Sequence, residues 1–206
     1  MKTPPRLVHR YQPPKGSSGR TLLLLHGTGG DENSLIPLSG ALDATAGILA
    51  VRGQVLENGA PRFFRRLSEG VFDLDDLRFR THELADFIAD SASEYGFSLN
   101  SLVAVGYSNG ANIASSVLFL RPEVLAGGIL LRAMTPFETE SALNLAGKRV
   151  LLLEGKFDPI VPLENAEMLH HQYVLAGAQT ELRWIESDHR LTRSELNLAS
   201  EWLQGA

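Results

Sequence analysis

The feature that most constrains the fold is a series of short, continuously apolar runs that alternate with longer segments of helical period. Strands that are buried on both faces form unbroken apolar runs, because neither face of their sheet meets water. Helical segments between such strands connect them in parallel and cover both faces. The sequence therefore predicts an α/β fold with a mostly parallel central sheet. The expected strands are Thr21–Leu25, 48–51, 102–105, 128–131, 150–153 and 180–185, and 7–11 can add an antiparallel edge strand.

Four segments between or after these runs show the three- and four-residue spacing of an amphipathic helix. In the longest, Leu77, Thr81, Leu84 and Ile88 share one face, and acidic residues occupy the first turn, where they interact favourably with the helix dipole. Proline or glycine follows two of the others, as is common where a helix ends. The predicted helices are 75–95, Asn109–Leu120, 161–175 and 193–203.

The composition is that of one globular unit. Hydrophobic residues make up 44% and charged residues 21% of the 206 residues, close to the average of globular domains. This length supports one sizeable core and is short for two domains. We therefore predict a single domain over 1–206, in which 1–19, rich in proline, glycine and serine, is an irregular lead-in.

Charge and residue usage exclude several classes of ligand. The formal net charge of -5 disfavours nucleic acid or an anionic membrane surface as the main partner, because either requires clustered cations. The one dense basic patch, 62–66, is too short to change this, so a small molecule is the expected ligand. Because the chain has no cysteine, it has no disulfide, no thiolate metal site and no cysteine nucleophile.

The sequence also predicts where the protein is located and whether it binds a metal. The first residues lack the apolar segment of a secretion signal and no apolar run could span a membrane, so we expect a soluble, cytoplasmic protein. Asp73, Asp75 and Asp76 form a carboxylate cluster without the glycine and distal glutamate of a calcium loop, which is typical of a helix start. We expect no metal and no cofactor, and the sequence leaves a homodimer open.

A serine lies at the junction of a predicted strand and a predicted helix. Its motif, Gly106-Tyr107-Ser108-Asn109-Gly110, is weak alone, but a strand directly before and a helix directly after are the context of a nucleophile elbow. Small residues are required around such a turn because larger side chains would collide with the strand and helix. The hydroxyl would then be exposed at a helix N-terminus, where an oxyanion is stabilised. The alternative is a helix N-cap serine.

A serine nucleophile needs a base and an acid that orients the base, in the chain order Ser, Asp, His for this kind of turn. Asp158 lies in the turn after a buried strand. Of the histidines that follow it, His170 and His171 lie inside a predicted helix, whereas His189 follows the last strand. Because this places His189 on the same sheet edge as Ser108 and Asp158, we predict that it is the base.

The glycine-rich loop 26–32 follows the first core strand. Its glycines allow backbone N–H groups to face a substrate oxygen, and we predict that the N–H groups of Thr28 and Asn109 form an oxyanion hole. Two other kinds of site are excluded. A dinucleotide-binding loop needs glycine at Glu32, and a phosphate-binding loop needs serine or threonine where Phe157 stands.

Two connections, 53–73 and 132–145, are longer than the alternation of strands and helices requires. Long loops in compact domains commonly line or cover a site, and the alternative is a decorated surface loop. Apolar residues within them are candidates for an acyl pocket, although residues of this kind are as often plain core. These candidates are Phe63, Phe64, Phe72 and Met134.

In these motifs the chain resembles the small carboxylesterase/phospholipase family of α/β-hydrolases, the group that includes acyl-protein thioesterases. The resemblance runs from about Thr21 to the end and implies an α/β-hydrolase fold with minimal or no cap domain. It implies the same site residues, with Ser108 as nucleophile, Asp158 as acid, His189 as base and the amides of Thr28 and Asn109. The motifs that carry it are Leu25-His26-Gly27-Thr28-Gly29-Gly30-Asp31, Gly106-Tyr107-Ser108-Asn109-Gly110, Gly155-Lys156-Phe157-Asp158-Pro159-Ile160-Val161-Pro162 and Asp188-His189-Arg190-Leu191.

Two positions depart from the family pattern. Asp188 stands where glycine usually precedes the histidine, and it places a second carboxylate next to His189. Asn109 stands where glutamine commonly follows the nucleophile.

The resulting functional hypothesis is a serine carboxylesterase that acts on small or short-chain carboxylic esters through an acyl-enzyme. An acyl thioesterase or lysophospholipase would use the same triad and is the first alternative. The second alternative is a non-catalytic binding protein on a hydrolase scaffold.

Overall fold

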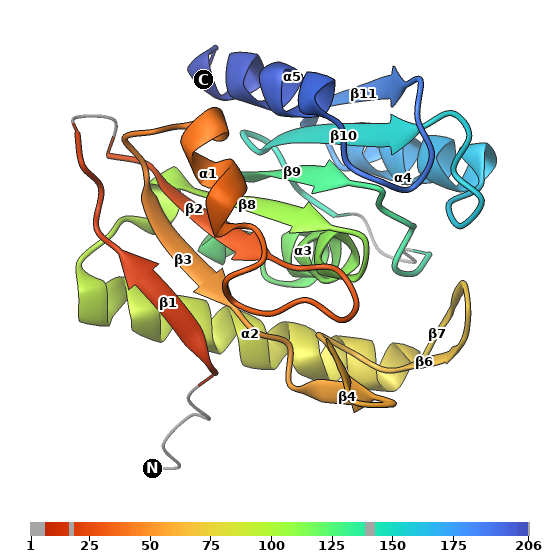
Figure 1. Cartoon of the computed structure of the whole chain (residues 1–206), viewed down its shortest axis with the longest axis horizontal. Helices are drawn as coiled ribbons and strands as arrows, with labels where there is room; N and C mark the ends of the chain where they lie inside the picture. Colours follow the sequence, from red (N-terminus) through yellow and green to blue (C-terminus); the bar gives the residue numbers. More distant parts are fainter. Residues whose placement is uncertain (1–6, 17–18, 139–142, 206) are drawn as a thin grey trace.

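The computed structural model describes residues 7–16, 19–138 and 143–205, and its main feature is a seven-stranded sheet. The strand order is β1-β3-β2-β8-β9-β10-β11, in which β1 is antiparallel to β3 and all other neighbours are parallel (Figure 1). The predicted parallel sheet with one antiparallel edge strand is confirmed. The strands are β1 (His9–Gln12), β2 (Thr21–Leu25), β3 (Gly47–Val51), β8 (Leu102–Tyr107), β9 (Gly127–Leu131), β10 (Arg149–Gly155) and β11 (Gln179–Ile185).

Helices cover both faces of this sheet. On one face lie α2 (Leu74–Tyr95), α3 (Asn109–Leu120) and α4 (Leu163–Leu175), and on the other α1 (Ile36–Leu42) packs against α5 (Arg193–Gln204) (Figure 1). Short 3-10 turns, η1 (Leu99–Ser101) and η2 (Pro122–Val124), lie before β8 and after α3. None of the helices is long and apolar enough to cross a membrane, over the residues that the structure describes.

The apolar strands divide the core into two layers. Along β2, Leu23 and Leu25 pack in the layer that contains α2, α3 and α4, while Leu22 and Leu24 pack in the layer that contains α1 and α5. This alternation follows from the two-residue period of a strand. Each of these leucines is at most 2% exposed, which explains why the sequence runs are apolar without interruption.

The structure also contains elements that the sequence did not predict. Helix α1 is one of them. It has seven residues, with a proline near its start, and only Ser39 and Leu42 are buried. Its sequence is therefore too short to show a long periodic pattern. The connection 53–73 is another, because it folds into two small hairpins beside the N-terminal end of α2 (Figure 1). Their strands are β4 (Val55–Glu57) with β5 (Ala60–Arg62), and β6 (Arg66–Ser68) with β7 (Val71–Phe72).

Parts of two predicted segments lie outside the described residues. These are 1–6 and 17–18 of the lead-in, and 139–142 of the connection 132–145. Within the described remainder, β1 accounts for the regular part of the lead-in, and 132–138 follows β9 without further strand or helix.

Candidate active site

Ser108 occupies the turn between β8 and α3, with backbone angles of φ 52° and ψ -116°. A positive φ is rare for a residue with a side chain and marks a strained turn. The flanking glycines permit it: a Cβ on Gly110 would lie 2.0 Å from the Leu25 carbonyl oxygen, and one on Gly106 would lie 2.5 Å from the Gly110 oxygen. The turn therefore exists because the two glycines let the helix start against β2 and β8.

The side chains of Ser108, His189 and Asp158 are joined in series by hydrogen bonds. Nε2 of His189 lies 3.0 Å from Oγ of Ser108, and Nδ1 lies 2.7 Å from Oδ2 of Asp158. Because the carboxylate accepts at Nδ1, the imidazole carries its proton there and presents Nε2 as an acceptor to the serine hydroxyl. This arrangement can remove the hydroxyl proton and stabilise the imidazolium that results.

The backbone around Asp158 holds its carboxylate in place. Oδ1 accepts hydrogen bonds from the N–H groups of Ile160 at 2.8 Å and Val161 at 3.2 Å, which leaves Oδ2 for the imidazole. The side chain is fully buried, and Nε of the equally buried Arg132 lies 3.8 Å from Oδ2. These partners fix the orientation of the Asp158 carboxylate.

Arg132 binds the loop that carries His189. Its guanidinium donates to the backbone oxygens of Asp188 at 2.9 Å and Arg190 at 3.0 Å, and to Oγ of Ser187 at 2.8 Å. It also donates to the Leu153 oxygen at 3.0 Å and forms an ion pair with the buried Glu195. These contacts tie the histidine loop to β10 and to the first turn of α5.

A second buried carboxyl lies next to this cluster. Oε1 of Glu154 accepts from the N–H of Ala133 at 2.8 Å, and Oε2 has no hydrogen-bond partner among the described residues. Burial raises the pKa of Glu154 well above its ordinary value, and the nearby Asp158 and Glu195 raise it further. Burial therefore favours the protonated form of Glu154, close to Asp158.

Thr28 and Asn109, whose backbone amides were predicted to form an oxyanion hole, both lie close to Ser108. The N–H of Asn109 is in the first turn of α3, where no carbonyl of the helix can accept it, and Thr28 lies in the glycine-rich loop after β2. Neither amide has an acceptor among the described residues. The loop is held from the other side, since the Thr28 hydroxyl accepts from Arg62 at 2.6 Å and the Gly29 N–H donates to the Pro61 oxygen at 2.9 Å.

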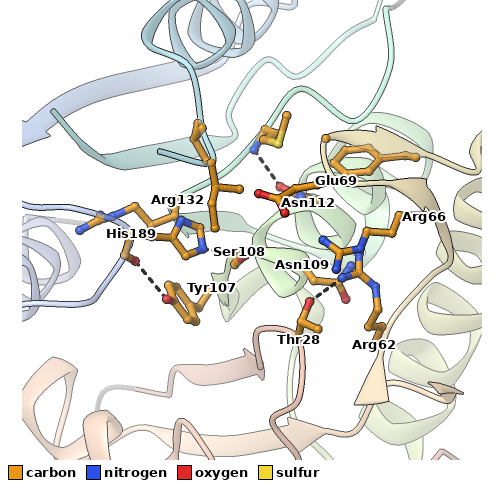
Figure 2. A pocket seen from close by; sticks show the side chains of 15 residues that line it. Thr28, Arg62, Arg66, Glu69, Tyr107, Ser108, Asn109, Asn112, Arg132 and His189 are labelled. Carbon is orange, nitrogen blue, oxygen red and sulfur yellow. Dashed lines mark hydrogen bonds between the residues drawn. The ribbon is translucent and has the colours of Figure 1, made fainter. Parts of the chain in front are cut away.

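A cavity of about 310 Å³ opens at this point. Figure 2 shows His189 and Arg132 on one side of Ser108, and Arg62, Arg66 and Thr28 on the other. The lining of the cavity is mixed, with charged and amide side chains among the apolar ones. The lining residues are Thr28, Arg62, Arg66, Glu69, Gly70, Phe72, Tyr107, Ser108, Asn109, Asn112, Arg132, Met134, Ile160, Val161 and His189.

Comparison with known proteins agrees with this geometry. The putative hydrolase MhqD of Bacillus subtilis (strain 168) is 47% identical over 200 residues, which cover 97% of this chain and 99% of that protein. A crystal structure of the Bacillus cereus carboxylesterase is also 47% identical, with a TM-score of 0.94 over 97% of this chain and 94% of that one. The chain belongs to the carboxylesterase/phospholipase family of α/β-hydrolases.

The predicted family and fold are thereby confirmed. A further solved member, YahD with malic acid, is 30% identical, has a TM-score of 0.90 and covers 97% of this chain and 99% of its own. No protein-family model matches the chain. The described residues contain no group of three or more His, Asp or Glu side chains that could hold a metal ion.

The structure separates the four residues predicted for the acyl pocket. Phe72 and Met134 line the cavity. Phe63 and Phe64 do not, because they are 4% and 0% exposed and belong to the core layer of α2 and α3. Phe63 packs on the ring of His26, and Phe64 packs edge-on against Phe72, so each supports a residue nearer the site.

One of the two departures from the family pattern, Asp188, is turned toward its own loop. Its carboxylate accepts from the Arg190 N–H at 2.9 Å and pairs with the Arg190 guanidinium at 2.8 Å. These bonds lower the pKa of Asp188, with the guanidinium as the main cause. The side chain therefore forms an exposed ion pair, while the backbone oxygen of Asp188 is the group that contacts Arg132.

Several residues of the site were not assigned by sequence reasoning. Arg132 and Arg62 were not, because the sequence does not show that a charged residue is fully buried. Tyr107 supports the histidine loop through a hydrogen bond from its hydroxyl to the His189 oxygen at 3.0 Å. Asn112 accepts from the Met134 N–H at 2.8 Å and so positions the connection after β9. The available signals were positional: Arg132 directly follows a core strand, and Arg62 lies in the unexplained connection.

His26, at the start of the glycine-rich loop, has a structural role. It is 1% exposed, Nδ1 donates to the Gly27 oxygen at 2.7 Å, and Nε2 accepts from the Gly53 N–H at 3.0 Å. Burial lowers its pKa, which agrees with a neutral ring that donates on one side and accepts on the other. It fastens the glycine-rich loop to the start of the connection 53–73.

Proposed function

We propose that this family member hydrolyses small or short-chain carboxylic esters through an acyl-enzyme, with Ser108 as nucleophile, His189 as general base and acid, and Asp158 as the orienting carboxylate. The observation that carries the proposal is the hydrogen-bonded series Ser108–His189–Asp158, with spacings of 3.0 and 2.7 Å, at the wall of a cavity. Carbonyl substrates entering that cavity would meet the serine hydroxyl and the free amides together.

The reaction follows from the roles of these groups. Oγ of Ser108 attacks the ester carbonyl while Nε2 of His189 takes the hydroxyl proton, and the amides of Thr28 and Asn109 bind the oxyanion. The tetrahedral intermediate expels the alcohol, which receives that proton from His189. Water then attacks the acyl-serine with His189 as base, the acid is released, and the Ser108 hydroxyl is restored.

The size and lining of the cavity support small substrates. About 310 Å³, bordered by charged and amide side chains, suits a short acyl group better than a long lipid chain. The YahD structure was solved with malic acid, a small acid, which is consistent with a ligand of this size. A series of p-nitrophenyl esters should therefore give its highest kcat/KM at two to four acyl carbons, and a maximum at long chains would contradict the proposal.

The decisive variant is Ser108→Ala. It should lower kcat for p-nitrophenyl acetate by at least about 10⁴-fold, because no other group supplies the nucleophile, and it should abolish labelling by a fluorophosphonate probe. Ser93→Ala, on the exposed face of α2, is the matched control and should keep both properties. Wild-type turnover in Ser108→Ala would overturn the assignment.

The same measurements distinguish the alternatives. A thioesterase would cleave acyl-coenzyme A substrates faster than the matching esters, with the same dependence on Ser108. A binding protein on a hydrolase scaffold would show neither turnover nor labelling of Ser108 in the folded wild type.

A further inference from the structure

We propose that Arg62 and Arg66 form an anion-binding subsite for the acyl part of the substrate, so that the preferred esters are half-esters of short dicarboxylic acids with a free carboxylate at the far end. The inference rests on the proposed ester hydrolysis and specifies its substrate class. Both arginines line the cavity beside Ser108 and lie next to Asn109 in Figure 2.

The direction of the acyl group follows from the position of the base. His189 must protonate the departing alcohol oxygen, so the alcohol lies on the His189 side of Ser108. The acyl chain therefore extends toward the opposite wall, where Figure 2 shows Arg62 and Arg66. A group at the end of a short acyl chain would meet the two guanidinium groups.

The protein balances the charges of this pair only in part. Among the described residues, Glu57 is the one carboxylate paired with them, at 2.8 Å from Arg66 and 3.4 Å from Arg62, which leaves a net positive charge on these three side chains. Arg62 is 3% exposed, and its burial, together with the neighbouring Arg66, lowers its pKa. A carboxylate from a ligand would offset the cost of burying this uncompensated charge.

The pair also has hydrogen-bond donors that remain unused. Arg62 donates to the Phe64 oxygen and to the Thr28 hydroxyl, while Arg66 donates only through Nε, to Glu57. The terminal nitrogens of Arg66 therefore have no acceptor among the described residues. A planar guanidinium with both terminal nitrogens free matches a carboxylate in two parallel hydrogen bonds.

Asn109 adds a third donor. Its Oδ1 accepts from the Phe63 N–H at 2.7 Å, which fixes the orientation of the amide. Its Nδ2 is buried and has no acceptor within the described part of the chain. The exposed Glu69 also lines the cavity, but its charge is solvated and opposes an anion only weakly. The donor set of this wall thus favours an anionic or strongly accepting group.

The test compares monoethyl succinate with ethyl levulinate, a neutral ester in which a methyl ketone replaces the carboxylate. Release of acid at pH 7 is followed by titration. The wild type should hydrolyse the half-ester with at least about tenfold higher kcat/KM than the neutral ester. Arg66→Gln should remove most of this preference, because it should lower kcat/KM at least about fivefold more on the half-ester than on the neutral ester. Arg66→Lys should restore part of it, because the charge returns without the planar fork.

Arg65→Gln is the matched control. Arg65 is adjacent in sequence, carries the same charge and is 62% exposed, but it pairs with Asp73 and does not line the cavity. This variant should keep the wild-type preference. Equal kcat/KM for both esters in the wild type, or an equal loss on both esters in Arg66→Gln, would overturn the subsite.

A binding measurement separates this inference from the proposed reaction. Succinate should raise the Tm of the wild type and of Ser108→Ala more than butyrate does, and it should lose this advantage in Arg66→Gln. If succinate binds in this way but no ester is cleaved, the reaction is wrong and the subsite stands. If esters are cleaved but succinate and butyrate act alike, the reaction stands and the subsite is wrong.

Discussion

Arginines lie on both sides of Ser108, and the two sides differ in how far the protein satisfies them. Arg132 is fully buried, donates to four backbone or side-chain oxygens, and is paired with Glu195 and near Asp158. Arg62 and Arg66 share one carboxylate and keep donors free. A satisfied buried cation fixes structure, whereas an unsatisfied one next to a cavity is available to a ligand.

The largest expected effect in this comparison is that of Arg132→Met. It would leave Glu195 and Asp158 buried without their cation and should lower the free energy of unfolding by about 3–5 kcal/mol. Urea unfolding followed by circular dichroism measures this. The control is Arg121→Met, which removes exposed ion pairs to Asp86 and Glu123 and should cost about 0–1 kcal/mol. Equal costs for the two variants would show that the Arg132 cluster is not a structural centre.

Arg62→Met should have an intermediate effect. It removes hydrogen bonds to the Phe64 oxygen and the Thr28 hydroxyl, but Glu57 keeps Arg66 as a partner, so the expected cost is about 1–3 kcal/mol. The same urea unfolding experiment compares the loss of unfolding free energy in Arg62→Met with that in Arg132→Met. A cost as large as that of Arg132→Met would mean that Arg62 is as important for stability as Arg132, contrary to the comparison.

A further effect, which depends on pH, concerns Glu154, next to Arg132. The pKa of Glu154 is raised in the folded state. Above the ordinary glutamate pKa the unfolded chain therefore releases a proton that the folded protein still holds. The free energy of unfolding then falls as pH rises from the ordinary pKa toward the pKa of the folded state. Glu154→Gln keeps a neutral side chain at every pH. Its free energy of unfolding should therefore improve relative to the wild type between pH 5 and 9.

The control for this prediction is Glu201→Gln, on the exposed surface of α5, which should follow the wild type across the same range. Unfolding curves for the three proteins at pH 5, 7 and 9 make the comparison. Parallel dependence on pH for Glu154→Gln and the wild type would contradict a protonated Glu154.

The sequence predicted the frame because burial on both faces leaves a strong pattern. The run Thr21–Leu25 and the helix Asn109–Leu120 were predicted with the bounds that the structure has. The positions of Ser108, Asp158 and His189 followed from the shared edge of parallel strands, and the structure brings their side chains together. Their catalytic roles remain a proposal.

What the sequence could not predict depends on contacts between distant segments. Nothing in the sequence indicates that Arg132 would be buried or that Asn109 would bind the backbone of Phe63. The hairpins within 53–73 have strands of two or three residues, too short for a two-residue period to be recognised. The distinction between core and cavity for Phe63 and Phe72 has the same origin, because both are aromatic residues in one irregular segment.

The pairing of the hairpins has a consequence for how such a protein can change over time. Strands β4 to β7 pair only with one another in the described structure, while β3 and α2 on either side belong to the main frame. Replacement of 54–72 by a segment of other length would keep the strand pairs of the large sheet and the bonds of Arg132, but it would remove the core side chains Phe63 and Phe64. The cavity wall can thus diverge among descendants of one ancestor while Ser108, Asp158 and His189 keep their places. Each new segment would have to rebuild the contacts of this one to Asn109 and to the glycine-rich loop.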